Sequence, residues 1–288
     1  MRQSLDISST TALTMRTANW TPGAPKGIDA LADAVQRELR RYPRTGRFLM
    51  GRLRSALTED EKQLVEQVIE SEHTLESGTQ VARRGAECSS STILIEGFAI
   101  RVLERRGRSH IVGLQVPGDF IDLHGFALKR LDHDNYVLGP ARVGRVSHAR
   151  LRQLLDRQPH LGRLLWFSTL LDAAVHREWI VKLEDLGAAQ RVAHVFCEIC
   201  CRLEMVGLDG ASGFSLLLTQ AQLASMCGTT TVHMSRALRR LREETGASFR
   251  HGKLTCPDPS AMAAFCQFDP SYLYGPGELH LPGGDYED

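Results

Sequence analysis

Residues 218–241 constrain the fold more than any other part of the chain, because several independent signals agree within these 24 residues. Thr219 and Gln222 have the spacing of a capping box, which begins a helix. Gly228 then falls where a left-handed backbone angle favours glycine, and Thr230 is a good N-cap for a second helix. Two short helices joined by such a turn form a helix-turn-helix.

The second helix of this motif has an apolar stripe at helical spacing, made by Met234, Ala237, Leu238 and Leu241. The opposite face of this helix is therefore exposed. Its short side chains and arginines can form hydrogen bonds with the edges of bases in the major groove. Further along the helix, contacts with phosphates are expected instead. We expect DNA contacts from Thr219, Gln220, Thr230, Thr231, Val232, His233, Ser235, Arg236, Arg239 and Arg240.

A short basic hairpin is expected after the motif, at residues 249–255. Arg250, His251 and Lys253 would stand at its tip, as in a winged helix-turn-helix whose wing lies on the DNA backbone. The alternative is an incidental exposed turn.

A β-rich region precedes the motif, at residues 73–148, where short apolar runs alternate with glycine and proline. Several short strands at close spacing predict a small antiparallel sandwich or jelly roll. The expected strands are residues 80–82, 92–96, 99–103, 110–116 and 141–146. A helix at residues 58–71, begun by the capping box of Thr58 and Glu61, precedes them.

A long helix follows the β-rich region, at residues 159–186, and has more apolar side chains than one stripe can hold. A helix that is apolar on more than one face must be buried on more than one face. One face would cover the barrel and the other would meet a second copy of the chain. The alternative is an ordinary core helix within a monomer. Another helix is expected at residues 188–206.

Several classes of protein are disfavoured by the composition. No run of apolar residues is long enough to span a membrane, and residues 1–20 have no apolar signal region, so we expect a cytoplasmic protein. The seven cysteines argue against a disulfide framework, and Cys197-x-x-Cys200-Cys201 lies in an apolar helical pattern that favours a structural role. Motifs of serine hydrolases, phosphate-binding loops and zinc proteases are absent, so we expect no enzyme.

A barrel, a long helix and a winged helix-turn-helix in this order resemble the Crp/Fnr family of cyclic-AMP-receptor-like bacterial transcription regulators. The resemblance covers about residues 60–265 and is most specific at residues 93–97, 116–120, 191–198 and the motif itself. It implies an α+β fold with a cyclic-nucleotide-binding-like jelly roll, and a homodimer formed through the long helix. It also implies a two-fold-symmetric double-stranded DNA site and RNA polymerase as a partner.

Composition and the resemblance together predict that the chain has five parts. They are residues 1–57, an extension that is largely disordered with a helix at about 28–41; residues 58–158, the sensory barrel; residues 159–186, the dimerisation helix; residues 187–266, the winged helix-turn-helix; and residues 267–288, an acidic tail. The extension is basic, and the tail contains no lysine or arginine. The tail would remain in solvent, whereas the sequence leaves open whether the extension folds against the barrel.

The resemblance also suggests which bases are read. Arg236 matches the arginine that contacts guanine in family members. Val232 stands where many members have a glutamate that accepts from cytosine; valine cannot accept, but it can pack on a thymine methyl. We therefore expect a DNA site that differs from the best-known family sequence.

Two departures from the family concern its ligands. Nucleotide-binding members hold the cyclic phosphate with an Arg-Ser pair, whereas residues 118–126 contain no arginine and two acids, Asp119 and Asp122, which would repel a phosphate. A cyclic-nucleotide-responsive regulator is therefore the runner-up interpretation. No cysteine precedes Cys88, which argues against the N-terminal iron–sulfur cluster of other members. We expect no cofactor, and the effector stays open.

A metal-dependent barrel enzyme is the alternative from a different class. It is suggested by His110, Asp119, Asp122, His124, Asp132, His133 and Asp134. The two closely spaced histidines, acid and third histidine of such barrels are absent, so we expect no metal site. Haem sensing through a barrel histidine is a further alternative.

Overall fold

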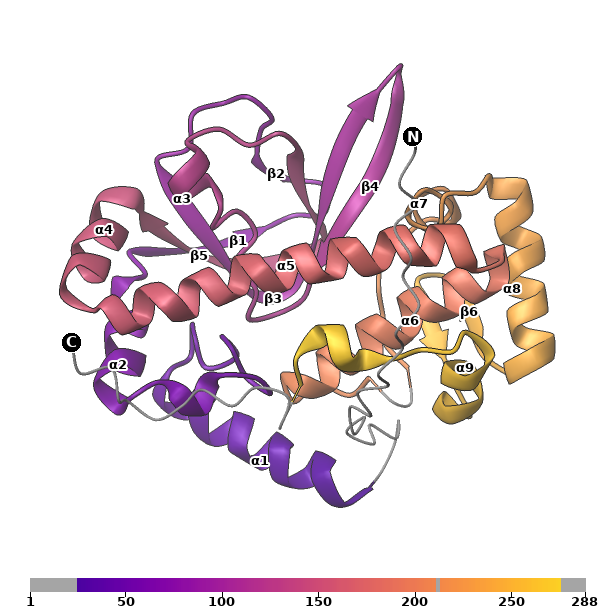
Figure 1. Cartoon of the computed structure of the whole chain (residues 1–288), viewed down its shortest axis with the longest axis horizontal. Coiled ribbons are helices and arrows are strands. Elements are labelled where there is room, and N and C mark those ends of the chain that lie inside the picture. The colour runs from indigo at the N-terminus through magenta and orange to yellow at the C-terminus, as the bar shows by residue number, and fades with distance from the viewer. Residues whose placement is uncertain (1–24, 211–212, 276–288) are drawn as a thin grey trace, which may run out of the picture.

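The computed structural model describes residues 25–210 and 213–275 (Figure 1). The N-terminal half contains α1 (Pro25–Arg41), η1 (Arg54–Ala56), α2 (Glu59–Val68), β1 (Ser71–Leu75), β2 (Gln80–Ala82), β3 (Ser90–Arg105), β4 (Arg108–Gln115), α3 (Gly125–Leu128), β5 (Asp134–Ser147) and α4 (His148–Arg157). The C-terminal half contains α5 (Pro159–Asp185), α6 (Ala188–Met205), α7 (Gln220–Met226), α8 (Thr231–Thr245), β6 (Ser248–Arg250), β7 (Lys253–Thr255), α9 (Pro259–Phe265) and η2 (Pro270–Leu273).

The N-terminal domain is built on a five-stranded antiparallel sheet in the order β1-β5-β3-β4, with β2 also paired to β5. The expected strands at residues 92–96 and 99–103 are one long strand, β3, which continues through Gly97 with shifts in register. β1 has mostly exposed, polar side chains, so no apolar alternation predicted it. β4 lies at an edge of the sheet, a position that matters for the DNA-binding domain.

The expectation that residues 1–57 are largely disordered is wrong for the part that the structure describes. The helix expected at 28–41 is confirmed as α1. The segment after it is folded: Phe48, Leu53 and Leu57 are buried in one cluster with α2 and the sheet. The ring of Phe48 meets that of Phe120 edge-on, with 5.5 Å between centroids. Residues 1–24 lie outside the described residues.

The long helix α5 runs beneath the sheet and beside α6, and it joins the two halves of the molecule (Figure 1). Its first half packs Leu161 and Leu164 into the cluster around Phe48, and its second half packs Trp179 against α6. The predicted helix at 159–186 is confirmed. Its expected burial on a second face is not met within the single chain, where Trp166, Leu170 and Ile180 remain exposed.

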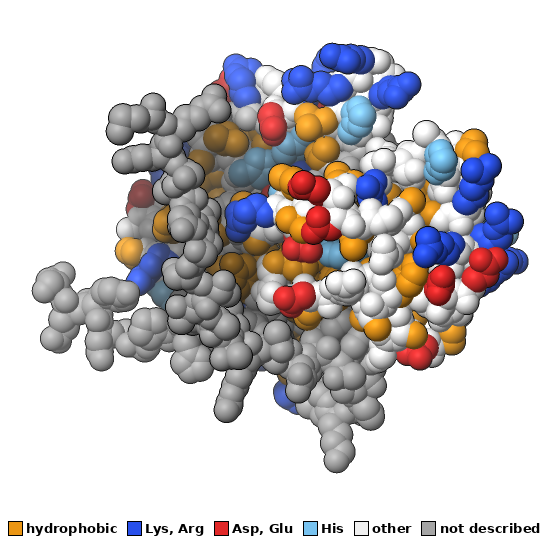
Figure 2. Space-filling model, turned by 45° about the vertical axis from the view of Figure 1, so that its right-hand side comes forward, with side chains coloured by type: hydrophobic (Ala, Val, Ile, Leu, Met, Phe, Trp, Pro, Cys, Tyr) orange, Lys and Arg blue, Asp and Glu red, His pale blue; other side chains and the backbone are white. Residues whose placement is uncertain are grey.

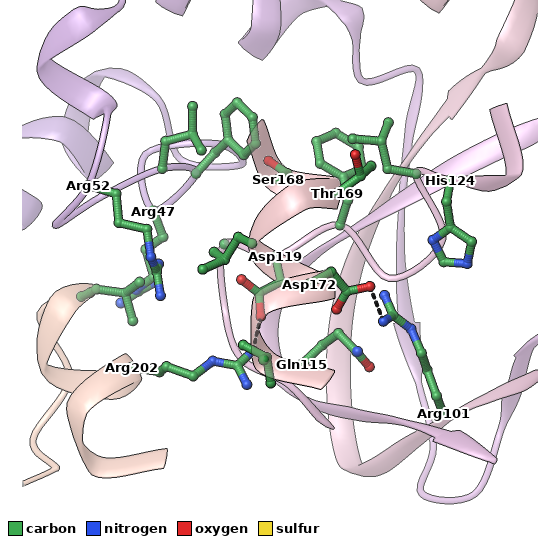
Figure 3. Close-up of a pocket in the computed structure, with 18 residues that line it drawn as sticks. Arg47, Arg52, Arg101, Gln115, Asp119, His124, Ser168, Thr169, Asp172 and Arg202 are labelled. Atoms are coloured by element: carbon green, nitrogen blue, oxygen red, sulfur yellow. Dashed lines mark hydrogen bonds and ion pairs between the residues drawn. The ribbon is translucent and has the colours of Figure 1, made fainter. Parts of the chain in front are cut away.

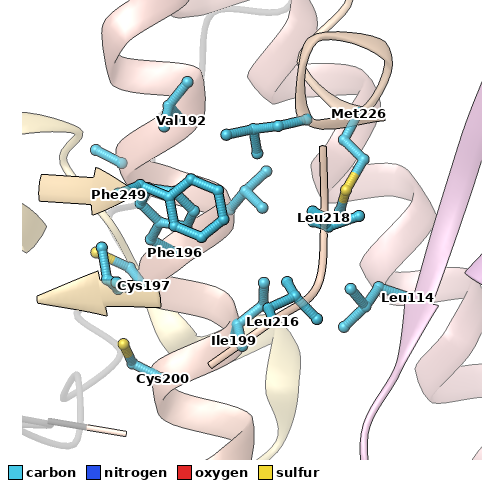
Figure 4. Packing of buried hydrophobic residues seen from close by; sticks show 14 of the residues in the cluster. Leu114, Val192, Phe196, Cys197, Ile199, Cys200, Leu216, Leu218, Met226 and Phe249 are labelled. Carbon is cyan, nitrogen blue, oxygen red and sulfur yellow. The ribbon is translucent and has the colours of Figure 1, made fainter. Parts of the chain in front are cut away.

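The core of the C-terminal domain surrounds α6. Figure 4 shows Phe196 next to Phe249 of β6, and Leu218 beside Met226 of α7. Cys197, Cys200 and Cys201 are free thiols buried in this core, which agrees with their expected structural role.

The expectation that residues 267–288 form a solvated tail is also wrong in part. Leu273 of η2 is fully buried, and its carbonyl accepts a hydrogen bond from Arg52 Nε at 2.8 Å. Tyr272 donates its hydroxyl to Glu198 Oε2 of α6 at 3.0 Å. The chain therefore returns to the N-terminal segment after α9. Residues 276–288, with most of the acidic side chains, lie outside the described residues.

Candidate nucleic-acid interface

The helix-turn-helix has the local geometry that its spacing predicts. Thr219 caps α7, because its hydroxyl accepts from the Gln222 backbone at 3.1 Å while Gln222 Oε1 accepts from the Thr219 backbone at 2.9 Å. Gly228 has a φ of 58° in the turn. Thr230 caps α8 and accepts from the His233 backbone at 3.3 Å.

The recognition helix α8 is divided into a buried and an exposed face as expected. Met234, Ala237 and Leu241 are buried against α6 and α7, and Leu238 is half-buried. Val232, an apolar side chain, is 64% exposed on the opposite face. Ser235 on that face donates to Gln220 Oε1 at 3.2 Å, which ties α8 to the start of α7.

All ten side chains expected to contact DNA are exposed to solvent. Seven of them follow one another along the first three turns of α8, and Thr219 and Gln220 begin α7 close by. Arg240 pairs with Glu244 one turn on, with 3.6 Å between Nε and Oε1, whereas Arg236 and Arg239 form no ion pair with a described residue. These two arginines are therefore available to an outside partner.

The expected hairpin is also present. β6 and β7 pair antiparallel, with Arg250 opposite Lys253, so only His251 and Gly252 form the turn. Both have positive φ, 50° and 75°, as in the turns that fit the twist of a two-residue hairpin. Arg250, His251 and Lys253 are exposed at its tip, which is the arrangement of a basic wing.

The helix-turn-helix is docked on the sheet through β4. Ser225 of α7 accepts a hydrogen bond from the Ile111 backbone at 2.9 Å and donates to the Ser109 carbonyl at 3.3 Å. Nothing in the sequence indicated this contact, because a serine within a helix carries no signal of its distant partners. It fixes the position of the DNA-binding domain on the edge strand.

A cavity of about 50 Å³ lies among the N-terminal segment, the sheet, α5 and α6 (Figure 3). Its polar lining is Arg47, Arg52, Arg101, Gln115, Asp119, His124, Ser168, Thr169, Asp172 and Arg202. Figure 3 shows Arg101 paired with Asp172 of α5 and Arg202 paired with Asp119. Buried Arg52 Nη2, Arg101 Nε and Gln115 Oε1 have no hydrogen-bond partner.

Of the two acids expected to repel a phosphate, Asp119 is paired with an arginine and Asp122 does not line the cavity. Asp119 accepts from Arg202 Nη2 at 2.6 Å, so its charge is balanced. Asp122 is buried and accepts from the backbone and hydroxyl of Thr92, and burial raises its pKa to about 6. The arginines that line the cavity come from other segments; Arg101, a charge within an apolar run, was the available signal.

The barrel histidines do not form a metal site. The rings of His124 and His133 lie 5.1 Å apart, and burial, followed by the charges of Arg101 and His133, lowers the pKa of His124 to about 4. His133 is buried, and its Nδ1 lies 2.7 Å from Oδ1 of the neighbouring Asp132. Within the described ranges, no three His, Cys, Asp or Glu side chains converge to hold a metal ion.

Comparisons with known proteins agree on the DNA-binding domain. Residues 190–265 match a family described as the Crp-like helix-turn-helix domain. A probable transcriptional activator of Rhizobium leguminosarum bv. viciae is 27% identical over 174 residues, which are 59% of this chain and 70% of that protein. The transcriptional activator protein FnrL of Cereibacter sphaeroides is 26% identical over 141 residues, 48% of this chain, so the chain spans little more than half, 56%, of FnrL.

A solved structure shares the fold. FixK2 from Bradyrhizobium japonicum superposes with a TM-score of 0.61 at 17% identity, over 68% of this chain and 96% of FixK2. Among the described helices, none is long and apolar enough to cross a membrane. The named relatives are transcription regulators, not enzymes. The α+β fold class expected from the sequence is confirmed, and residues 190–265 form a Crp-like helix-turn-helix domain, as in DNA-binding transcription regulators of the Crp/Fnr type.

Proposed function

We propose that the chain acts as a homodimer that binds a two-fold-symmetric DNA site and reads it with α8. The observation that carries this proposal is the exposed face of α8, whose polar and basic side chains begin at the helix N-terminus and are flanked by a basic wing. Two such helices would enter successive major grooves about 34 Å apart. Because chromosomal DNA and RNA polymerase would be its partners, the protein would act in the cytoplasm.

Different side chains of α8 would contact bases and phosphates, according to their chemistry. Arg236, unpaired and exposed, would donate two hydrogen bonds to one guanine, and Val232 would pack on a thymine methyl. Arg239, a turn further on, would contact phosphates, as would Thr219 and Gln220 at the start of α7. The DNA site would therefore lack the cytosine that is contacted by a glutamate in family members that have glutamate at the position of Val232.

The first prediction tests base reading by Arg236. Arg236→Ala is expected to cost about 1–3 kcal/mol at each half-site, so specific footprints disappear at concentrations where the wild type protects its site. The site is obtained by genome-wide mapping of bound DNA and confirmed with purified protein. Arg236→Lys keeps the charge but cannot form the guanidinium fork, so it should lose specificity while it keeps affinity for unrelated DNA.

Arg152→Ala is the matched control for this experiment, because Arg152 is an exposed arginine of α4 on the far side of the sheet domain. It should leave the footprint unchanged. Unaltered operator affinity of Arg236→Ala would contradict the assignment of α8 as the reading helix.

The dimer is proposed from the uncovered face of α5. Large apolar side chains there remain in solvent: Trp166 (64% exposed), Leu170, Ile180 (65% exposed), Val181 and Leu183. Leu170 follows Trp166 by four residues and Ile180 follows Leu170 by ten, so the three lie along one side of the helix. A second α5 packed on this stripe would bury it.

Leu170→Glu combined with Ile180→Glu is expected to disrupt the dimer. Each protomer would lose two buried apolar side chains and place two carboxylates in the seam, so the dimer dissociation constant should rise more than a hundredfold. Sedimentation velocity over a concentration series measures it. Leu128→Glu is the control, since Leu128 is 63% exposed on α3, away from α5; equal dissociation by that variant would refute the seam.

The cyclic-nucleotide alternative is supported by the arginines and unpartnered polar atoms of the cavity. The cavity volume, about 50 Å³, is well below the roughly 300 Å³ or more of small-molecule sites, so a nucleotide would have to open it. We favour modulation of DNA binding through this barrel by a different effector. Isothermal titration with cAMP and cGMP separates the two ideas, since no heat at millimolar nucleotide eliminates the alternative.

A further inference from the structure

The hairpin between β3 and β4 ends in a strongly basic tip. Arg105 pairs with Arg108 across the two strands, so Arg106 and Gly107 alone form the turn. All three arginines are exposed, and none forms an ion pair with a described residue. The neighbouring carboxylate, Glu104, accepts a hydrogen bond from Ser109 at 2.6 Å. The tip therefore carries three guanidinium groups that the rest of the described chain does not use.

Arg106 is not explained by the turn itself. Its φ is 52° and that of Gly107 is 70°, the conformation of a two-residue hairpin turn in which asparagine, aspartate or glycine is favoured. A non-glycine residue other than Asn or Asp is uncommon at positive φ and is a reason to look for a function. An arginine that is held in an unfavourable conformation, without a partner in its own chain, suggests an anionic partner outside it.

The hairpin stands beside the helix-turn-helix. Its strand β4 is joined to α7 by the two hydrogen bonds of Ser225, and Figure 1 shows the hairpin extending past α7. Figure 2 shows two groups of lysine and arginine side chains on one face of the molecule. One group lies at the top, at the level of this hairpin, and the other lies over α8. A DNA duplex seated on α8 would therefore meet a second basic surface when it continues past α7.

The tip repeats the chemistry of the wing. The β3–β4 turn reads Arg105-Arg-Gly-Arg108, and the wing reads Arg250-His-Gly-Lys253, each with a basic side chain at the first positive-φ position and basic residues on both sides. We propose that the β3–β4 hairpin is a second wing, which contacts phosphates of the DNA that flanks the site read by α8. This inference rests on the proposed DNA-binding function and extends it to the sensory domain.

The test compares two charge-removing pairs in the full chain. Arg105→Gln with Arg108→Gln removes two of the three tip charges, and Arg83→Gln with Arg84→Gln removes two exposed arginines after β2. Affinity is measured over a KCl series on a duplex trimmed to the two half-sites and on one with about 20 added base pairs on each flank. On the long duplex the tip variant should lose about tenfold in affinity, and its salt slope should fall by about two for each engaged hairpin.

The outcomes separate this inference from the proposed function. No loss on the long duplex, or an equal loss with the Arg83 and Arg84 variant, overturns the second wing while the footprint of the wild type still supports DNA reading by α8. Unchanged DNA affinity with reduced transcription in a purified polymerase assay would overturn it too, since the tip would then contact a protein. Failure of the wild type to bind DNA at all would remove the proposed function itself.

Discussion

Replacement of Arg202 by leucine is expected to lower the free energy of unfolding by about 3–5 kcal/mol, because it leaves two carboxylates without their shared partner. Arg202 of α6 donates to Asp119 at 2.6 Å and to Glu198 at 3.0 Å. Burial alone would lower the pKa of this guanidinium, and the two acids outweigh that effect and raise it. The side chain therefore joins the DNA-binding half of the molecule to the turn after β4.

Chemical denaturation followed by circular dichroism measures this loss. Arg240→Leu is the matched control, since Arg240 forms an exposed pair with Glu244 on α8 and its removal should cost at most about 1 kcal/mol. A difference of less than 1 kcal/mol between the two variants would mean that the buried network does not stabilise the fold.

Phe48→Ala should cost about 3–5 kcal/mol, because Phe48 is only 1% exposed and its removal leaves a cavity beneath the sheet. Its ring packs against Phe120 and shares a cluster with Val65 and Leu161. The segment between α1 and α2 is thereby part of the domain and not an appendage.

Hydrogen exchange and denaturation of the Phe48→Ala variant test this role. Amides of residues 45–57 should lose protection together with those of α2, whose start lies beside them. Leu128→Ala serves as the control, since Leu128 is largely exposed and its truncation should change stability by less than about 0.5 kcal/mol. Wild-type stability in Phe48→Ala would contradict the role of this segment in the core.

The helix starts and the exposed face of α8 were predicted from the sequence because they depend on residues close together in the chain. The capping boxes at Thr58 and Thr219, the cap at Thr230 and the stripe of α8 all depend on residues three or four apart, so spacing alone reveals them. The face of α8 that would contact DNA follows from the same stripe, because whatever is not packed inward must face outward.

The features that the sequence did not predict depend on contacts between residues far apart in the chain. Residues 42–57 have neither a helical nor a strand period, and their burial depends on partners in α2, the sheet and α6. Arg202 and Asp119 are 83 residues apart, and Ser225 and Ile111 are 114 apart. No spacing rule reaches across such separations, so the cavity, the shared salt bridge and the docking of α7 could not be inferred.

The docking of α7 on β4 has a consequence for solubility. An edge strand presents free backbone groups that can pair with a strand of another molecule, and proteins usually cover or charge such edges. Here the side of β4 at Ser109 and Ile111 is covered by Ser225 of the DNA-binding domain. Any rearrangement that lifts α7 away uncovers that edge, so the population of such an open form sets how readily the protein self-associates through its sheet.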